Sequence, residues 1–233
     1  MKEFEKQIVI FGNFEYLDFN NVMKIKDFFE SYDMYLEGTP DFPKDLQFRD
    51  LQPRIITEPP LIRPMFINKA KSKRVVFGTF RINIEEYDNS IHKYDEFSLF
   101  AERLFSILFS DFGIKPNRLA VNGRLVQDLD KLTSYYEKFI SNISISGDIG
   151  SFGFNVEKIE YVEELKSNIN KILNIQKANV GLIGKPGSDC ILTSYDFNTI
   201  IQTQVLYTFE DYQTFKHMSD KYRNSIISDV MKL

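Results

Sequence analysis

The chain has 233 residues, of which 43% are hydrophobic, with 22 Phe and 12 Tyr, so it carries ample material for a core and too many aromatics for disorder. Its formal net charge of −4 argues against a protein whose whole surface binds nucleic acid. The single cysteine, Cys190, cannot form an internal disulfide, which is typical of a reducing compartment. We found neither a secretory signal nor a run approaching the roughly 20 apolar residues that cross a bilayer, and we expect a cytoplasmic protein without a membrane partner.

The first quarter of the chain predicts a strand, a helix and a long connection. Gln7–Leu17 is β-branched and aromatic, which favours a strand. Asp18 or Asn20 could cap a following helix. Its apolar face is spaced at helical intervals by Val22, Ile25, Phe28 and Phe29. Glu37–Pro64 holds most of the prolines and predicts an irregular connection, with one short strand at Arg54–Thr57. Such a connection either faces a partner or is a solvated spacer.

A hairpin with a basic tip is predicted next, from Met65–Asn68 and Arg74–Glu85. Alternation in the second strand predicts a core face made of Val76, Gly78, Phe80, Ile82 and Ile84. The tip carries the densest positive cluster in the chain, which consists of Lys69, Lys71, Lys73 and Arg74. These side chains could contact nucleic-acid phosphates, or they could guard a strand edge against unwanted pairing.

A long helix is predicted over Asp95–Phe112, where apolar residues cover a wide surface. Gly113 supplies a left-handed stop, and Pro116 prevents the helix from continuing. Arg118–Val126 then predicts a strand, and a short helix should run from Asp128 or Asp130 to about Phe139.

The remaining chain predicts a second run of strands that leads into a second long helix. The Ser-, Asn- and Gly-rich stretch Ser141–Ser151 is the candidate seam, and Phe152–Val156 should open the second half as a strand. Glu160–Leu173 fits either a helix or a strand. A turn at Gly184–Ser188, a strand at Cys190–Tyr195 and a final helix from Phe209 to Met231 complete the chain.

Together these elements predict an α+β fold of two packed halves, each with mostly antiparallel strands leading into a long amphipathic helix. The expected boundaries are residues 1–140 for the N-terminal half and 141–233 for the C-terminal half, although the two could form one continuous domain.

Residue types that serve catalysis and metal binding are scarce. Two histidines, His92 and His217, and Cys190 do not stand at zinc-ligand spacing, and we expect no metal and no cofactor. Cys190 begins an apolar strand, where a small buried thiol is the ordinary interpretation, and no nucleophile elbow occurs. Gly184-Lys185 does not fit a phosphate-binding loop, because Asn179 stands where the first glycine is required and Pro186 stands where Ser or Thr is required. We therefore expect no catalytic residue, leaving open an enzyme with a Cys–His pair assembled by the fold.

Candidate binding residues occur instead on the predicted strands. Arg118 and Arg124 could point to one face of their strand, and together with Arg81 they are candidate anion or partner contacts. Asp196 and Asn198 end the last strand, where they either bond the backbone of a turn or recognise a ligand. Solvated charges are the alternative interpretation for the arginines.

From Arg74 onward the order of features resembles a sporadically distributed family of uncharacterised bacterial and phage proteins. Four stretches carry the resemblance, namely Val75–Ile84, Tyr94–Phe112, Arg118-Leu119-Ala120 and Asp196-Phe197-Asn198-Thr199. The patchy occurrence of that family is similar to that of genes on mobile elements, which implies a role in conflict between phages and bacterial immunity.

The resulting hypothesis is a non-enzymatic protein that binds another macromolecule, as a phage-encoded inhibitor or accessory factor in phage–bacterial defence (anti-CRISPR-like). A protein partner is expected, and a homodimer through a strand edge or an apolar helix stripe is compatible with the composition. The alternative is a protein that binds nucleic acid or nucleotides through the basic hairpin.

Overall fold

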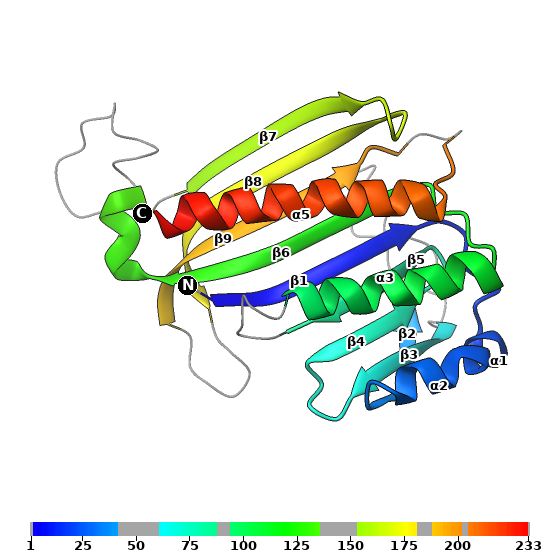
Figure 1. The fold of residues 1–233 in the computed structure, drawn as a ribbon. Coiled ribbons are helices and arrows are strands. Elements are labelled where there is room, and N and C mark those ends of the chain that lie inside the picture. Colours follow the sequence, from blue (N-terminus) through cyan, green and yellow to red (C-terminus); the bar gives the residue numbers. More distant parts are fainter. Residues whose placement is uncertain are drawn as a thin grey trace, which may run out of the picture.

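One nine-stranded antiparallel sheet organises the chain in the computed structural model, which describes residues 2–41, 61–87, 94–135, 153–180, 188–201 and 205–232. The strand order across the sheet is β2-β3-β4-β5-β1-β6-β9-β8-β7 (Figure 1). The strands are β1 (Lys2–Phe11), β2 (Met34–Asp41), β3 (Leu61–Asn68), β4 (Lys73–Phe77), β5 (Arg81–Glu86), β6 (Arg118–Asp128), β7 (Gly153–Val162), β8 (Ser167–Val180) and β9 (Ser188–Thr199).

The described helices all lie on one face of this sheet (Figure 1). They are α1 (Phe19–Val22), α2 (Lys26–Glu30), α3 (Tyr94–Asp111) and α5 (Phe209–Met231), with short 3₁₀ turns at Met23–Ile25 and Leu129–Lys131. The two long helices run antiparallel, because the end of α3 meets the start of α5. Ring centroids are 4.7 Å apart for Phe105 and Tyr212 and 5.7 Å apart for Phe109 and Phe209. At the other end of the pair, the hydroxyl of Tyr94 donates to Asp220 over 2.8 Å.

The core lies between the sheet and these helices. On the sheet it is built from apolar side chains that are paired across neighbouring strands, such as Ile8 with Ile84 and with Val121. Above them the helices contribute buried aromatic side chains. Phe29 of α2, for example, stacks on Phe66 at a centroid distance of 3.7 Å. Each such side chain contributes about 1.5–3 kcal/mol when it is removed from water, so this one layer supplies much of the stability.

Several sequence-based expectations are confirmed. The helices expected over Asp95–Phe112 and Phe209–Met231 form as α3 and α5. Asp18 caps α1 by accepting a hydrogen bond from the backbone nitrogen of Asn21 over 2.9 Å. Gly113 has a φ of +58°, the left-handed conformation expected of a residue that ends a helix. The structure is α+β, as predicted, with antiparallel strands and a C-terminal helix.

The interpretation of Arg74–Glu85 as one strand is wrong, because a turn divides it into β4 and β5. In consequence Val75 and Phe77 lie on the same buried face as Ile84 and Ile82, with which they pair. The predicted core residue Phe80 is instead 49% exposed in the turn. At the turn the buried apolar positions change from odd-numbered residues in β4 to even-numbered residues in β5. A single alternating pattern across Arg74–Glu85 could not predict this change.

Two further expectations change in the structure. Glu37–Pro64 is not irregular at its ends, since β2 includes Glu37–Asp41 and β3 begins at Leu61. Glu160–Leu173 resolves as the end of β7, a turn and the start of β8, so the strand alternative is the right one. The predictions at Arg54–Thr57 and Ser141–Ser151 lie outside the described residues, as does the predicted turn at Gly184–Ser188 except for Ser188, which begins β9.

The sheet is continuous across both predicted halves, because β6 pairs with β1 on one side and with β9 on the other. Within the described residues, no helix combines the length and the apolar character needed to cross a membrane.

Candidate functional site

The face of the sheet opposite the helices carries a row of two arginines around an aromatic ring. Phe11 of β1 pairs with Arg81 of β5 on one side and with Arg118 of β6 on the other. Residues paired directly across antiparallel strands share a face, so these three form one row, which we call the arginine row. The guanidinium carbon of Arg118 lies 5.0 Å from the centroid of the Phe11 ring. Arg81 is exposed.

Polar side chains gather beside Arg118, where β6, β9 and β8 run next to one another. The guanidinium of Arg118 donates to the carboxamide oxygen of Asn198 over 3.2 Å. Asn198 pairs with Asn170 of β8, and Asp196 pairs with Asn122 of β6. We call Arg118, Asp196, Asn198 and Asn170 the polar cluster. The structure thus brings together three residues that the sequence nominated separately, Arg118, Asp196 and Asn198.

Three atoms of the polar cluster are buried without a hydrogen-bond partner. They are Nε of Arg118, Oδ1 of Asp196 and Oδ1 of Asn170. A buried polar atom that makes no hydrogen bond costs roughly 1–3 kcal/mol, so native proteins leave few of them. One donor and two acceptors are therefore available within the cluster. They are shielded from solvent, so a ligand reaches them only by displacing a neighbouring side chain.

The electrostatics of the cluster centre on Asp196. Burial raises the pKa of this carboxyl above its ordinary value, while a hydrogen bond with Asn198 and the charge of Arg118 act in the opposite direction. Because desolvation is the largest of these effects, the carboxylate gains only part of the stabilisation that a full ion pair would give. A hydrogen-bond donor on a bound partner would supply the remaining stabilisation of the Asp196 carboxylate.

Ion pairs neutralise most of the other charges on the same face. Glu85 accepts hydrogen bonds from Gln7 over 3.1 Å and from the hydroxyl of Tyr87 over 2.9 Å, and it also pairs with Arg74. Arg124, which the sequence nominated as a contact, pairs with Glu5 at 3.0 Å. These basic groups already have carboxylate partners, so they are poorly placed to hold phosphate groups as well.

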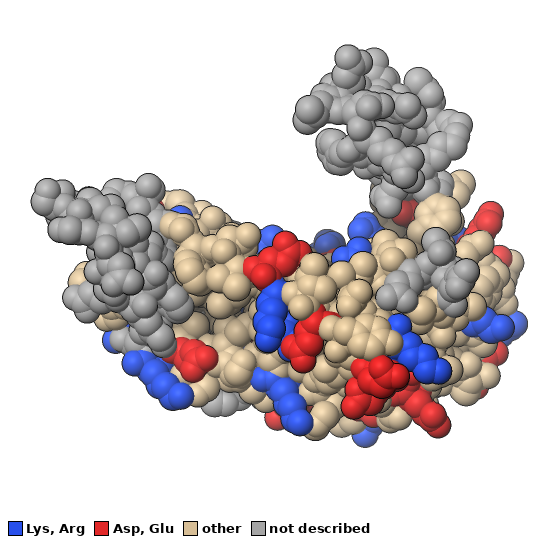
Figure 2. All heavy atoms as spheres, turned by 90° about the horizontal axis from the view of Figure 1, so that it is seen from above, with Lys and Arg blue, Asp and Glu red and all other residues tan. Residues whose placement is uncertain are grey.

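The basic hairpin does not form a single patch. Lys69 and Lys71 are exposed at its tip, between β3 and β4. Lys73 points toward the helices, where its ammonium lies 3.5 Å from Glu86 and 5.0 Å from the ring of Phe100. Arg74 points to the opposite face and pairs with Glu85. Figure 2 draws the molecule from the side on which β7 lies in Figure 1, away from this hairpin, and there basic and acidic side chains are interspersed, with no extended region of one sign.

Residues considered for catalysis lie apart from one another. Cys190 is buried in β9, where its thiol lies 3.4 Å from the carbonyl oxygen of Ala178, and His217 is exposed on α5. His92 lies outside the described residues. Among the residues that the structure describes, no three His, Cys, Asp or Glu side chains gather in a way that could hold a metal ion.

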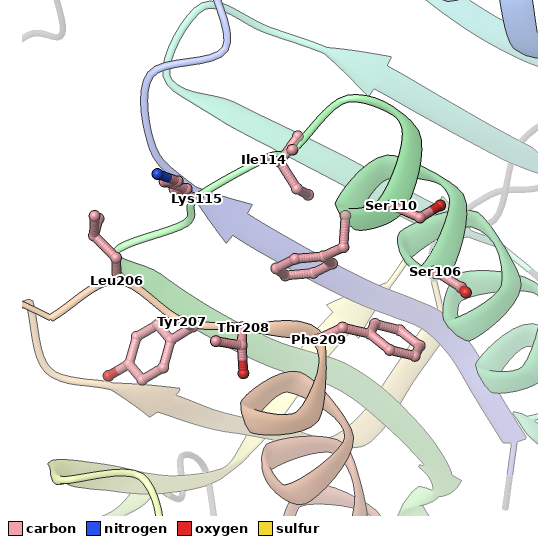
Figure 3. Close-up of a pocket in the computed structure, with 10 residues that line it drawn as sticks. Ser106, Ser110, Ile114, Lys115, Leu206, Tyr207, Thr208 and Phe209 are labelled. Atoms are coloured by element: carbon pink, nitrogen blue, oxygen red, sulfur yellow. The ribbon is translucent and has the colours of Figure 1, made fainter.

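Two adjoining hollows lie where α3 ends and α5 begins, and Figure 3 shows the larger one. Their volumes are about 570 and 450 Å³, and they share Gly113, Lys115 and Leu206 in their lining. The larger one is lined mainly by apolar surface, including Phe109 and Phe209. Within the described lining, Lys115 brings a positive charge but no carboxylate or histidine faces it, and general acid–base catalysis needs such a partner.

Sequence reasoning missed Phe11 and Asn170 as members of this face. Phe11 was part of a predicted strand, and Asn170 was part of a segment that fitted either a helix or a strand. The sequence showed what these side chains are but not which side chains lie next to them. Only the register of β1 against β5 and β6, and of β8 against β9, places them beside the arginines and Asp196.

No family model, no curated protein and no solved structure in the three comparisons matches the chain.

Proposed function

We propose that this is a non-enzymatic protein that binds another protein through the face of its sheet on which none of the described helices lies. The arginine row carries this proposal. Arg and aromatic residues supply a disproportionate share of the energy at protein–protein contacts, because they combine large apolar area with directional hydrogen bonding. Arg81, Phe11 and Arg118 offer this combination in one row, and Arg81 is exposed.

The polar cluster supports a peptide-like partner. Its unpartnered atoms comprise one donor and two acceptors, and polypeptide amides present both kinds of group. Nucleic acid would be drawn mainly to free positive charge. On this face Arg74 and Arg124 already pair with Glu85 and Glu5, which favours a protein partner over a phosphate backbone.

A role as an inhibitor or accessory factor in phage–bacterial defence is supported by the family resemblance alone. A cytoplasmic location is supported by the single cysteine, Cys190, which is buried and cannot form an internal disulfide.

We also propose that the fold consists of two related halves. Each would begin with a central strand, β1 or β6, and end with a strand that pairs back onto it and leads into a long helix. The boundary would then fall before β6, not at residue 140 as expected from the sequence. In the first half β5 pairs with β1 and precedes α3. In the second, β9 pairs with β6 and precedes α5. This arrangement supports the recurrence that the sequence suggested, and the two halves share one sheet.

Affinity purification with a matched pair of variants tests the binding proposal. The tagged protein should recover a stoichiometric protein partner from a lysate of its source cells. Arg81→Glu should lower that recovery at least about tenfold, equivalent to about 1.4 kcal/mol. Lys221→Glu makes the same charge change at an exposed position of α5, on the opposite side of the sheet, and should leave recovery unchanged.

Thermal unfolding of both variants would verify that each is folded. Equal recovery by the Arg81 variant and the wild type, or no stoichiometric partner at all, would contradict the proposal.

A further inference from the structure

We propose that the protein forms a two-fold symmetric dimer in which β7 pairs antiparallel with β7 of a second copy, so that the two sheets become one. This contact is separate from the arginine row, which lies on β5, β1 and β6.

The free edge of β7 is the first observation. Among the described strands, β7 is the last in the sheet and pairs with β8 alone. Figure 1 shows it at the margin of the sheet, beyond α5. Seven consecutive residues, Asn155 to Tyr161, are all exposed, so none of the described parts of the chain covers this stretch. An edge strand with such a long exposed stretch presents a row of backbone donors and acceptors to another strand.

Apolar side chains on this strand are the second observation. Val156 is 42% exposed, Ile159 57% and Tyr161 56%. Val156 lies on the face of the sheet that carries the helices, while Ile159 and Tyr161 lie on the other, because side chains alternate along a strand. A partner strand would therefore cover apolar surface on both faces at once.

The charges of β7 indicate that the strand that pairs with its edge is β7 of a second copy. Consider a two-fold axis that is perpendicular to the sheet and passes between Ile159 of one copy and Ile159 of the other. Each residue of one β7 then pairs with the residue of the other β7 that lies equally far from Ile159 on the opposite side. Lys158 then stands opposite Glu160 of the second copy, and the symmetry repeats this pair. Val156 meets Val162, and Ile159 meets itself. The strand is thus complementary to itself in both charge and apolar contact.

Neighbouring registers lack this match. An axis at Lys158 sets two ammonium groups opposite each other, and an axis at Glu157 or Glu160 sets two carboxylates opposite each other. Like charges directly opposite are destabilising in antiparallel pairs. The register centred on Ile159 avoids these clashes and gains two pairs of opposite charge.

The charged groups concerned are accessible for this pairing. The side chain of Lys158 is 70% exposed and lies 3.8 Å from Glu160 of its own strand, and Glu160 also pairs with Lys171 at 2.8 Å. A single pair of edge strands buries less than the roughly 1,200 Å² of a standard stable interface. We therefore expect a reversible dimer with a Kd on the order of micromolar.

Sedimentation velocity over a concentration series tests the dimer. The wild type should shift from monomer to dimer as concentration rises. Lys158→Glu or Glu160→Lys alone should each raise the Kd at least about tenfold, because symmetry places like charges opposite each other twice. The double variant, which carries both substitutions, should restore the wild-type Kd within about threefold. Lys221→Glu, an exposed change on α5, should leave the Kd unchanged.

Mixing the two single variants gives the sharpest readout. One carries acidic side chains at both 158 and 160 and the other carries basic ones, so an equimolar mixture should dimerise more strongly than either variant alone. Circular dichroism should show native secondary structure for each variant. A wild type that stays monomeric up to several hundred micromolar, or a dimer that neither single substitution weakens, would overturn the proposal.

Discussion

A buried ion pair joins the two ends of the chain. Nε of Arg223 on α5 donates to Glu3 of β1 over 2.9 Å, and a second guanidinium nitrogen pairs with the other carboxylate oxygen. The hydroxyl of Tyr195 donates to the same carboxylate over 2.8 Å, while Tyr94 lies 3.7 Å over the guanidinium. Glu3 is fully buried and Arg223 is 4% exposed. Each buried charge is thus stabilised by the other and not by water.

Removing one member of this pair should destabilise the fold strongly. Arg223→Met leaves the buried carboxylate of Glu3 without its cation, and we expect the free energy of unfolding to fall by about 3–5 kcal/mol. Urea unfolding followed by circular dichroism measures this change. Combining Arg223→Met with Glu3→Gln removes both charges and should recover part of the loss. A decrease below about 1 kcal/mol for the single variant would show that water reaches Glu3.

The environment of Arg63 differs from the one that the sequence pattern predicted. It fell within the stretch predicted to be irregular, yet it lies buried in β3. Its guanidinium donates to the carbonyl oxygens of Phe14, Glu15 and Leu17 over 2.8–3.0 Å and to that of Phe77 over 3.0 Å. Four acceptors explain how a buried charge is tolerated here, and they tie the turn after β1 to the sheet.

At the scale of elements, the long helices have clear local signals. Thr208 caps α5 by accepting from the backbone nitrogen of Asp211 over 3.2 Å, and the Asp211 side chain accepts from the backbone nitrogen of Thr208 over 2.8 Å. This capping box contributes on the order of 1 kcal/mol and fixes where the helix begins. Signals of this kind lie within a few residues of each other, as does the apolar spacing from which the sequence predicts the long helices.

The β3–β4 hairpin permits a test of the nucleic-acid alternative. Replacing Lys69 and Lys71 with Gln removes the two exposed charges, while Lys73 and Arg74 keep their carboxylate partners. Because the paired groups are neutralised, we expect little nucleic-acid retention in either protein, even at low salt. Retention on heparin or on a DNA column between 50 and ~200 mM salt measures this. A wild type retained with a steep salt dependence that the double substitution abolishes would favour the nucleic-acid alternative.

At the scale of the whole molecule, buried tyrosines should make the protein sensitive to alkali. Burial raises the pKa of Tyr87, Tyr135 and Tyr222 to about 12, and that of Tyr94, Tyr195 and Tyr212 well above its ordinary value. In the unfolded chain these phenols lose their protons near pH 10. The unfolded state then binds fewer protons than the folded state, so the free energy of unfolding falls as pH rises from about 10 toward 12.

Tyr212→Phe isolates one contribution to this effect. The Tyr212 hydroxyl is buried without a hydrogen-bond partner, so the variant should be at least as stable as the wild type at pH 8. Above about pH 10 it should lose stability less steeply, by up to about 1.4 kcal/mol per pH unit. Urea unfolding at pH values from 8 to ~11 measures the slope, with Tyr161→Phe at an exposed position as the control. Identical slopes for Tyr212→Phe and wild type would contradict the assignment.

The sequence by itself determined the features that depend on short-range pattern. The apolar face and stop of α3, the start of α5, the cap at Asp18 and the antiparallel α+β class all follow from residues within one or two helical turns or one strand. The scarcity of catalytic residue types also followed from composition. Strand limits were less certain, as the division of Arg74–Glu85 shows, because a tight turn can shift the alternation without any proline to mark it.

Only the tertiary structure decided which side chains meet. Arg81 and Arg118 lie 70 and 107 positions after Phe11 along the chain, and both become its neighbours through the pairing of β5, β1 and β6. The pairing of β4 with β5 and of β6 with β1 gave Arg74 and Arg124 their carboxylate partners, and the strand order left β7 at the margin. Strand order and register result from burying the whole apolar face against the helices at once, a long-range balance of packing that no local stretch of sequence contains.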